Sequence, residues 1–197
     1  MALKQLTEST ALAVVVEDLK DHLHVSSTDE DILLRQYVKV ATKQAEGIMK
    51  RQCCTAQYSL ILPEFQDVIE IPRPPLISTS LSIVYLDSGG TTQTLSSTNY
   101  EVDTYQEPAV IRLGYGQSWP ETLSVENAVR ISYVSGYEAS TVDNLPTIPD
   151  NIKVWIMLRA GDLYEHREGQ DLAAGAKGMS FVDGLLDDYK VPNTEGW

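Results

Sequence analysis

The feature that most constrains the fold is a change in hydrophobic period along the chain. Between residues 56 and 137, Thr, Ser, Val, Ile and Tyr occur in short alternating runs separated by Pro and Gly, which is typical of β-strands. On both sides of this segment apolar residues recur every three or four positions, as on one face of a helix. The pattern predicts an α+β fold, in which N- and C-terminal helices form a small bundle and the β-rich segment is inserted between them as a lobe.

This pattern divides the chain into four expected parts. They are the N-terminal helices of the bundle, the β-rich insertion lobe, the C-terminal helices that complete the bundle, and a tail: residues 1–55, 56–140, 145–191 and 192–197.

The helical segments have recognisable boundaries. Residues 9–25 are predicted to form a short amphipathic helix, and the spacing of Ser27 and Glu30 fits a capping box that begins a second helix, ending near Gln52. After Pro149 the helical spacing returns and continues to His166. A last short helix is predicted from Phe181, Leu185, Leu186 and Tyr189.

The β-rich lobe contains seven candidate strands: residues 57–62, 68–71, 80–86, 91–95, 100–102, 109–113 and 128–134. Residues 87–90, Asp-Ser-Gly-Gly, are predicted to form a hairpin turn, because glycine adopts positive φ angles without steric cost. Residues 72–75 contain three prolines, which lack the N–H that a central strand donates. We therefore expect an edge, a bend or a crossover there.

The charge balance excludes some functions. The chain has 15 Lys and Arg residues against 28 Asp and Glu residues, a formal net charge of −13. Such a charge repels phosphate, so binding of DNA or of an anionic membrane through overall charge is excluded, although a local basic patch is not.

Cys53 and Cys54 are sequence neighbours, which excludes a disulfide scaffold. The sequence shows no membrane span and no signal peptide, so we expect folding and assembly in a cytoplasm.

The sequence offers little for catalysis or metal binding. His22 and His24 are two positions apart, which does not place them on one helix face, and His166 is expected to interact with a helix C-terminus. Residues 114–118 lack the Gly-Lys-Ser/Thr ending of a phosphate-binding loop and read as a tight turn. Cys53 is expected to be a buried small hydrophobe. We therefore predict no enzyme activity, no catalytic, cofactor-binding or metal-binding residues, and no cofactor.

Acidic clusters do not change this prediction. Residues 29–31 and the group Asp183, Asp187 and Asp188 fall on predicted helix surfaces and lack the spacing of a calcium-binding loop, so solvated helix faces account for them.

Several segments together resemble the head-to-tail connector proteins of tailed bacteriophages. They are Ile-Pro-Arg-Pro-Pro-Leu at residues 71–76, Tyr-Gly-Gln-Ser-Trp-Pro at 115–120, Leu-Tyr-Glu-His-Arg-Glu at 163–168, and the opening segment 16–23 with the acidic residues that follow. The resemblance extends from about residue 14 to residue 189. The loop 168–178 and the tail 191–197 do not match the family pattern.

The resemblance implies a structural virion protein, also called an adaptor or head completion protein, located in the neck of the particle. Such subunits form a homo-oligomeric ring, of twelve copies in the family pattern, beneath the portal protein. The ring extends the DNA channel toward a stopper or tail terminator protein, and DNA passes through the lumen without specific binding. Excess acid on lumen-facing surfaces would suit this role, because repulsion keeps the duplex centred and mobile.

A ring needs two different faces on each subunit, and we expect one on the β-rich lobe and one on the helices. The candidate interface residues are Tyr115, Trp119, Tyr189 and Trp197, because aromatic residues are enriched in desolvated interfaces. Packing of Trp119 within its own lobe is an equally good interpretation, and the segment that carries Trp197 is either a docking peptide or a frayed end. The alternative function is a monomeric β-rich module that binds a ligand such as carbohydrate by aromatic stacking.

Overall fold

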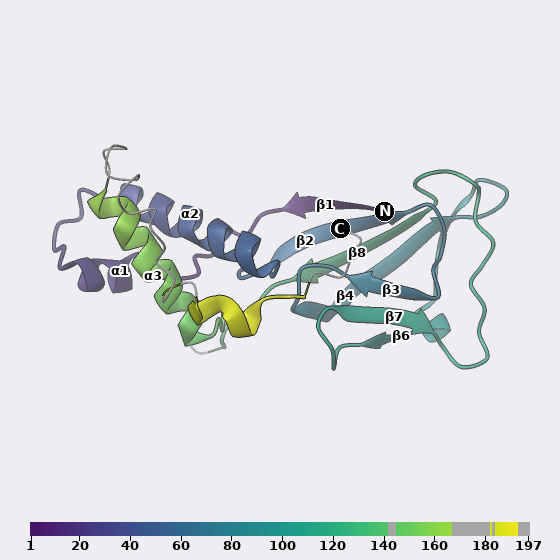
Figure 1. Cartoon of the computed structure of the whole chain (residues 1–197). Helices are drawn as coiled ribbons and strands as arrows, with labels where there is room; N and C mark the ends of the chain where they lie inside the picture. The colour runs from purple at the N-terminus through teal and green to yellow at the C-terminus, as the bar shows by residue number, and fades with distance from the viewer. Residues whose placement is uncertain (142–144, 167–181, 183, 193–197) are drawn as a thin grey trace. The chain divides into compact units, whose positions relative to one another are not determined.

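The computed structural model describes residues 1–141, 145–166, 182 and 184–192. It contains both helices and antiparallel sheets (Figure 1), so the predicted α+β class is confirmed. The chain forms two compact units. We call one the helical unit, Thr10–Cys54 with Tyr137–Lys190, and the other the β unit, which is built mainly from Met1–Ser9 and Thr55–Gly136.

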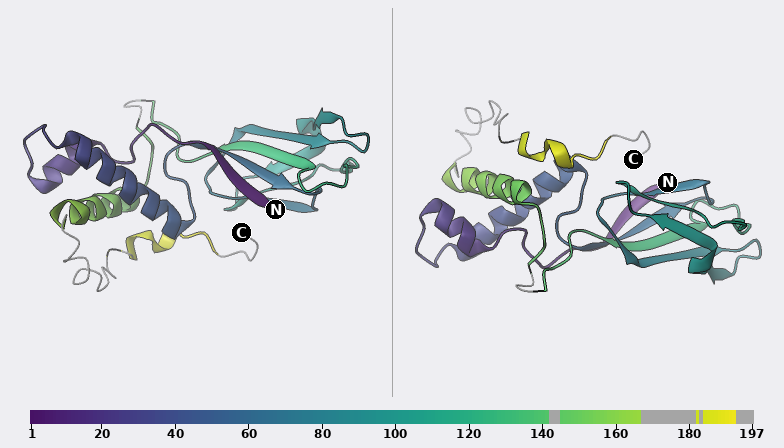
Figure 2. Two further views of the ribbon diagram at one scale, coloured as in Figure 1. Left: turned by 90° about the horizontal axis from the view of Figure 1, so that it is seen from above. Right: turned by 90° about the horizontal axis from the view of Figure 1, so that it is seen from below.

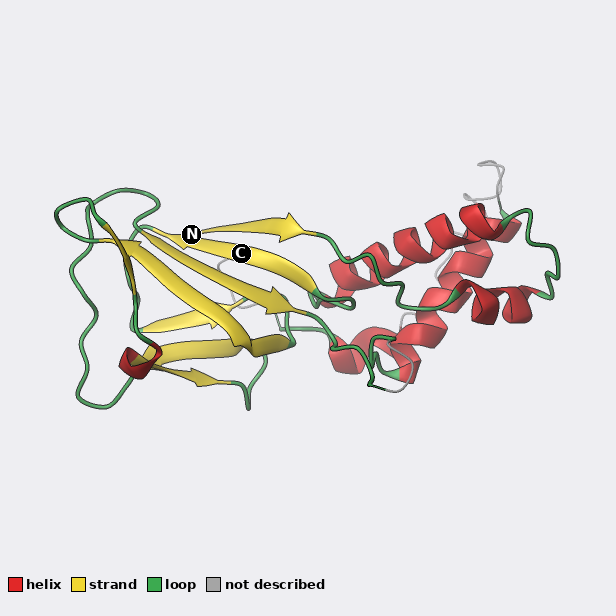
Figure 3. Ribbon diagram, turned by 180° about the vertical axis from the view of Figure 1, so that it is seen from behind, coloured by secondary structure: helices red, strands yellow, loops and turns green. Residues whose placement is uncertain are grey.

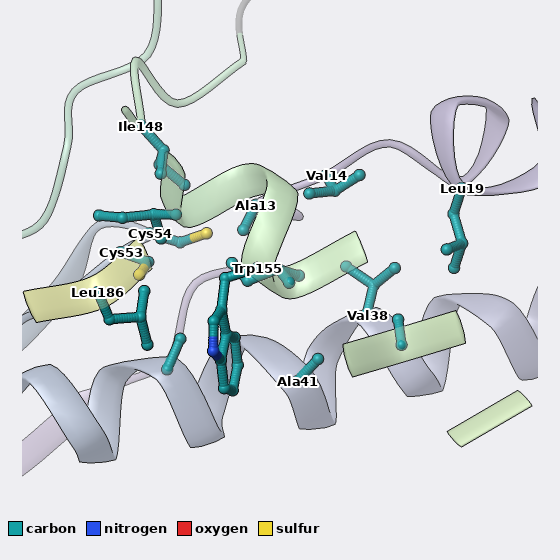
Figure 4. Packing of buried hydrophobic residues seen from close by; sticks show 14 of the residues in the cluster. Ala13, Val14, Leu19, Val38, Ala41, Cys53, Cys54, Ile148, Trp155 and Leu186 are labelled. Atoms are coloured by element: carbon teal, nitrogen blue, oxygen red, sulfur yellow. The ribbon is translucent and has the colours of Figure 1, made fainter. Parts of the chain in front are cut away.

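The helical unit contains α1 (Val16–Leu23), α2 (Asp31–Met49), α3 (Asp150–Glu165) and the 3-10 helix η2 (Gly184–Tyr189). These elements bury one shared apolar cluster, part of which Figure 4 shows, with Trp155 of α3 pointing toward α2 beside Ala41. Its fully or almost fully buried members include Leu19, Leu34, Val38, Ala45, Ile152, Ile156, Ala160 and Leu186. The apolar positions that recur every three or four residues in the sequence therefore face this core.

The first two helices differ from the prediction at their ends. The helix expected over residues 9–25 begins only at Val16. The capping box was wrong, because Glu30 is the N-cap of α2 and makes no side-chain capping bond. The Ser27 hydroxyl instead donates to Asp29 Oδ2 (2.8 Å) and accepts from the Asp29 backbone N–H (3.2 Å). A local Ser–Asp turn thus takes the hydrogen bonds that a capping serine would give to the helix.

The second helix also ends earlier than predicted, at Met49, because a buried carboxylate folds the chain back. Glu46 is 4% exposed, and its Oε1 accepts from the Cys53 backbone N–H (3.0 Å) and from Gln52 Nε2 (2.8 Å). Gln52 Nε2 also lies 2.8 Å from the carbonyl oxygen of Cys54. Lys43 Nζ lies 3.2 Å from the second carboxylate oxygen. The buried acid is therefore well satisfied, as its burial requires.

The β unit consists of two antiparallel sheets, which Figure 3 shows in yellow. The five-stranded sheet has the order β1-β2-β8-β4-β5, with bounds Ala2–Thr7, Ala56–Leu62, Val129–Ser135, Leu76–Leu86 and Thr92–Thr94. The three-stranded sheet has the order β3-β7-β6, with bounds Val68–Ile71, Ala109–Leu113 and Tyr100–Asp103; the short 3-10 helix η1 (Ser97–Asn99) precedes β6. Buried residues of both sheets form one core, including Leu60, Ile83 and Ile131 with Ile69, Ile71 and Ile111.

The first strand, β1, was not predicted. Residues 1–55 were expected to belong to the helices, but Ala2–Thr7 pairs antiparallel with β2, with Leu3 opposite Leu60 (Figures 1 and 2). Five of its six residues are exposed and the sixth is only partly buried. A strand without a buried face carries no alternating apolar pattern, so the sequence gives no sign of it.

The predicted strand break at residues 72–75 and the predicted turn at residues 87–90 lie where expected. The proline segment 72–75 connects β3 to β4 and lies in neither. In the turn after β4, Gly90 has φ 81°, and Asp87 Oδ1 accepts from the backbone N–H groups of Gly89 (3.0 Å) and Thr91 (2.8 Å). Hydrogen bonds from the Gln93 side chain and from the Thr91 N–H lower the pKa of Asp87. The predicted hairpin turn is confirmed.

The Glu46 contacts predict a stability effect. Replacing Glu46 with Ala leaves the Cys53 N–H without its buried acceptor and removes one of the two acceptors of Gln52 Nε2, which should lower the free energy of unfolding by about 2–4 kcal/mol. Glu46→Gln keeps one acceptor oxygen and should cost less. Urea denaturation followed by circular dichroism measures both. Glu165→Ala, at an exposed acid of α3, is the control and should change stability by less than about 0.5 kcal/mol. Equal midpoints for Glu46→Ala and Glu165→Ala would contradict the assignment.

Two helical glycines predict opposite responses to the same change. An added Cβ at Gly47 of α2 meets no atom within 4 Å, so Gly47→Ala should raise the free energy of unfolding by about 0.5–1 kcal/mol through helix propensity. A Cβ at Gly161 of α3 would lie 3.3 Å from Leu23 Cδ2, so the Leu23 side chain must give by a few tenths of an ångström and the gain is reduced or reversed. Thermal unfolding compares the two variants. A larger rise for Gly161→Ala than for Gly47→Ala would show that α1 and α3 do not approach so closely.

Candidate interaction surfaces

Trp119 packs against other aromatic side chains of the β unit. Its ring is stacked on Phe65, with centroids 4.7 Å apart and planes 4° from parallel, and Phe65 meets Tyr85 edge-on at 5.7 Å. Trp119 is partly buried, and its indole N–H has no hydrogen-bond partner in the described part of the chain. One face of the indole is therefore covered by Phe65 of the same unit. This contact supports packing of Trp119 within its own lobe, the alternative to an interface role.

Tyr115 lies fully exposed, two residues after β7, at 101% relative accessibility. The backbone N–H of Gln117 donates to the carbonyl oxygen of Gly114 (3.0 Å), and Gly116 has φ 73°. Residues 114–117 thus form the tight turn predicted in place of a phosphate-binding loop. A fully exposed tyrosine buries its ring only in contact with another molecule, so Tyr115 stays a candidate interface residue.

A second fully exposed tyrosine, Tyr105, was missed by the sequence analysis. It is 103% exposed and lies in the connection from β6 to β7, at the other end of β7 from Tyr115. The Tyr105 backbone N–H donates to Asp103 Oδ1 (2.9 Å), and Gln106 Nε2 lies 3.3 Å from Asp103 Oδ2. An aspartate followed by an aromatic residue between two short strands was the available signal of an exposed turn.

The other two candidates lie elsewhere. Tyr189 belongs to η2, is partly buried against the helical core, and its carbonyl oxygen accepts from Arg51 Nε (3.1 Å). Trp197 lies outside the described residues. The candidates therefore do not form one patch: Tyr115 and Trp119 belong to the β unit, and Tyr189 belongs to the helical unit.

The histidines and cysteines that were considered as catalytic or metal-binding residues lie at helix ends or in the core. His24 is the left-handed C-cap of α1, and His166 Nδ1 lies 3.1 Å from Asp162 Oδ1 at the end of α3. Burial, followed by the charge of Glu46, raises the pKa of Cys54 to about 12, and burial raises that of Cys53 well above 9. Both thiols are protonated at neutral pH, the inert form of a cysteine.

The described residues form neither a metal-binding cluster nor a membrane-spanning helix. Within residues 1–141, 145–166, 182 and 184–192, no three His, Cys, Asp or Glu side chains gather closely enough to hold a metal ion. No helix in that part of the chain combines the length and the hydropathy needed to span a bilayer.

The two neighbouring aromatic residues predict different stability effects. Trp119→Ala removes the stack on Phe65 and should lower the free energy of unfolding by about 2–3 kcal/mol, whereas Tyr115→Ala should change it by less than about 0.5 kcal/mol. Urea denaturation monitored by circular dichroism measures both variants. If Trp119→Ala leaves the midpoint unchanged, the indole does not support the β unit and its interface role becomes the better interpretation.

Comparisons by sequence give no assignment. No protein-family model matches the chain, and no curated protein matches it.

Comparisons of structure do find similar chains. A chain from the neck of an empty gene transfer agent (GTA) particle, computed with C6 symmetry, is 21% identical; the match covers 100% of this chain and 99% of that one, with a TM-score of 0.78. A chain from the virion of a native GTA particle gives 21% identity, the same coverage and a TM-score of 0.76. A chain from the neck of a native GTA particle, computed with C12 symmetry, gives 22%, the same coverage and 0.74. These matches confirm, at the level of the fold, the resemblance to neck proteins predicted from the sequence.

Proposed function

We propose that the protein is a head-to-tail adaptor, a structural subunit of a virion neck. The observation that carries this proposal is the likeness to chains from GTA necks over the whole length of both chains, at TM-scores from 0.74 to 0.78. The match covers this whole chain, and so includes its two N-terminal helices, the inserted β unit and the returning helix α3. A match that extends through both units supports a shared assembly role better than a match to one unit would.

The proposed assembly is a closed ring of identical subunits. The similar chains come from necks computed with C6 and C12 symmetry, which supports a ring of twelve subunits. A ring with one rotation axis is built from heterologous contacts, in which one face of a subunit meets a different face of the next. The ring lies between the portal protein and a stopper or tail terminator protein, and its lumen extends the DNA channel.

The charge distribution supports a channel that does not hold DNA. The chain has a net charge of −13, and the segments Met1–Ser9 and Thr55–Gly136 of the β unit contain four Lys or Arg residues against ten Asp or Glu residues. Phosphate binding requires cations that displace counterions, so a surface of this composition repels the duplex. We infer that the lumen is acidic and that DNA slides past it without specific contacts.

The exposed tyrosines support contacts with neighbouring neck proteins. Tyr105 and Tyr115 each offer a whole ring to a partner, from opposite ends of β7. Sites for carbohydrate instead present aromatic rings along one shared surface, on which a sugar stacks. The placement of these tyrosines, together with the stacking of Trp119 on Phe65, favours the adaptor over the carbohydrate-binding module.

Reconstitution with a portal tests the function. The full-length chain is mixed with the portal of the same particle, and the masses of the free and mixed proteins are measured by mass photometry, with images of the complex by electron microscopy. We expect one ring of about twelve subunits on each portal, because a portal offers a template that concentrates the subunits. Duplex DNA at 0.15 M salt should not be retained by the chain alone.

Failure to form a ring on the portal would contradict the proposed function. A chain that remains monomeric and leaves the portal mass unchanged at micromolar concentrations is not an adaptor. A mass increase confined to one or two subunits per portal would contradict the ring. The matched control is the portal of an unrelated phage, which tests that the contact is specific.

A further inference from the structure

The outward face of α2 is basic in an otherwise acidic protein. Arg35, Lys39 and Lys43 are exposed on this helix, and so is Lys50, which is its C-cap. The two acids of α2 do not balance them at the surface, since Glu46 is buried and Asp31 forms an ion pair with Lys20 of α1 at 2.8 Å. The helix thus presents a stripe of one sign to solvent.

The spacing of these cations is unfavourable within the subunit itself. Arg35, Lys39 and Lys43 are four residues apart, so they form one row about 12 Å long on the helix surface. Like charges at this spacing destabilise a helix, whereas a counter-charge beside them would remove the repulsion. Arg35 and Lys39 form no ion pair with any described residue. Arg35 and Lys39 therefore lack an ion-pair partner among the described residues, whereas Lys43 contacts Glu46.

Apolar side chains accompany the basic row. Ile32 is 75% exposed and Val40 is 46% exposed, on the same side of α2 as Lys39 and Lys43. A nucleic-acid backbone supplies phosphate but gives such residues no apolar surface to pack against. The mixture of cations and exposed aliphatic residues therefore favours a protein partner with acidic groups.

A face of that kind exists on α1 of the same protein. Val16 and Leu19 of this helix point into the core, while Glu17, Asp18 and Asp21 are exposed. These three carboxylates form no ion pair with any described residue. Glu17 and Asp21 are four residues apart, so the acidic face extends about 6 Å along α1, which is the spacing of Arg35 and Lys39 in the basic row. The acidic face is therefore opposite in charge to the basic row and matches one of its two steps in length.

We propose that the partner is a second copy of this chain: the basic face of α2 in one subunit packs against the acidic face of α1 in the next. The inference rests on the proposed ring and names one of its heterologous contacts. Both helices belong to the helical unit, and they are labelled in Figure 1. The contact neutralises a row of cations on every subunit, so the surfaces left open to the lumen stay acidic.

Charge reversal tests the contact in the full-length protein. Arg35→Glu with Lys39→Glu reverses the α2 face, and Glu17→Lys with Asp21→Lys reverses the α1 face. Each double variant places like charges at the contact, so the concentration needed for half-maximal ring formation, alone or on the portal, should rise at least tenfold. The same rise should follow for the unchanged protein at 1 M salt, where the Debye length falls to about 3 Å.

Mixing the two double variants gives the sharper result. In a ring that alternates them, each reversed α2 face meets a reversed α1 face, and each native α2 face meets a native α1 face. Equimolar mixing should therefore restore ring formation to within about threefold of the unchanged protein, with the two variants present in equal number. The chain that carries all four substitutions should also assemble by itself. Mass photometry and native mass spectrometry measure both outcomes.

A charge reversal in the β unit serves as the control for these variants. Arg112→Glu with Arg130→Glu makes the same change in net charge as the α2 double variant, at exposed cations of the β unit, and should leave assembly within about threefold. Circular dichroism confirms that every variant is folded. Rings that form normally in both double variants, or variants that fail alone and are not restored by mixing, would overturn the contact. If the unchanged chain binds the portal or, against expectation, retains DNA, and the α2 variant loses that binding with rings intact, the face belongs to the portal or to DNA. If the unchanged chain forms no ring even on the portal, the proposed function itself fails.

Discussion

The buried carboxylate of Glu46 fixes the point at which the chain leaves the helical unit, and the insertion of a second unit depends on that point. Its two acceptor bonds hold Gln52 and Cys53 against the end of α2. Cys53 in turn accepts from the Tyr137 backbone N–H at 3.1 Å, and Cys54 forms a parallel bridge with Tyr137. The chain therefore leaves and re-enters the helical unit at neighbouring positions. An inserted unit needs this proximity. Because its two ends lie side by side, the core of the helical unit can pack whether or not the inserted β unit is folded.

The β unit meets the same constraint from its own side. Ala56, where the insertion begins, is paired with Ser135, where it ends, in the register of β2 and β8. These two strands lie at the centre of the five-stranded sheet, with β1 and β4 on their outer sides. The neighbouring ends are therefore held by a complete antiparallel ladder rather than by a flexible loop. Each unit has its own buried cluster, so the hydrophobic stabilisation of one does not require that of the other.

The sequence predicted those features whose cause is local, and missed those whose cause lies elsewhere in the chain. Helical periods in α2 and α3 and the turn at Asp87 were readable because their apolar faces and turn residues are contiguous. Strand β1 depends on an exposed pairing with β2, and the stack of Trp119 involves Phe65, a residue 54 positions away. The basic residues of α2 are present in the sequence, but no face was predicted from them. The structure was needed to recognise the basic face, because it shows that neither acid of α2 balances these cations at the surface: Glu46 is buried and Asp31 is paired with Lys20.

The net charge of −13 and a basic contact face are compatible because they act over different distances. At physiological ionic strength the Debye length is about 8 Å, so the charges of two approaching subunits are largely screened until their surfaces nearly touch. At contact, the outcome depends on which side chains face one another, and complementary groups a few ångströms apart attract while like-charged pairings are rejected. A strongly acidic subunit can thus avoid non-specific association through most of its surface and still select one orientation of its neighbour. Under the proposed arrangement, the same excess of acid that disfavours wrong contacts between subunits also keeps DNA from adhering to the channel they enclose.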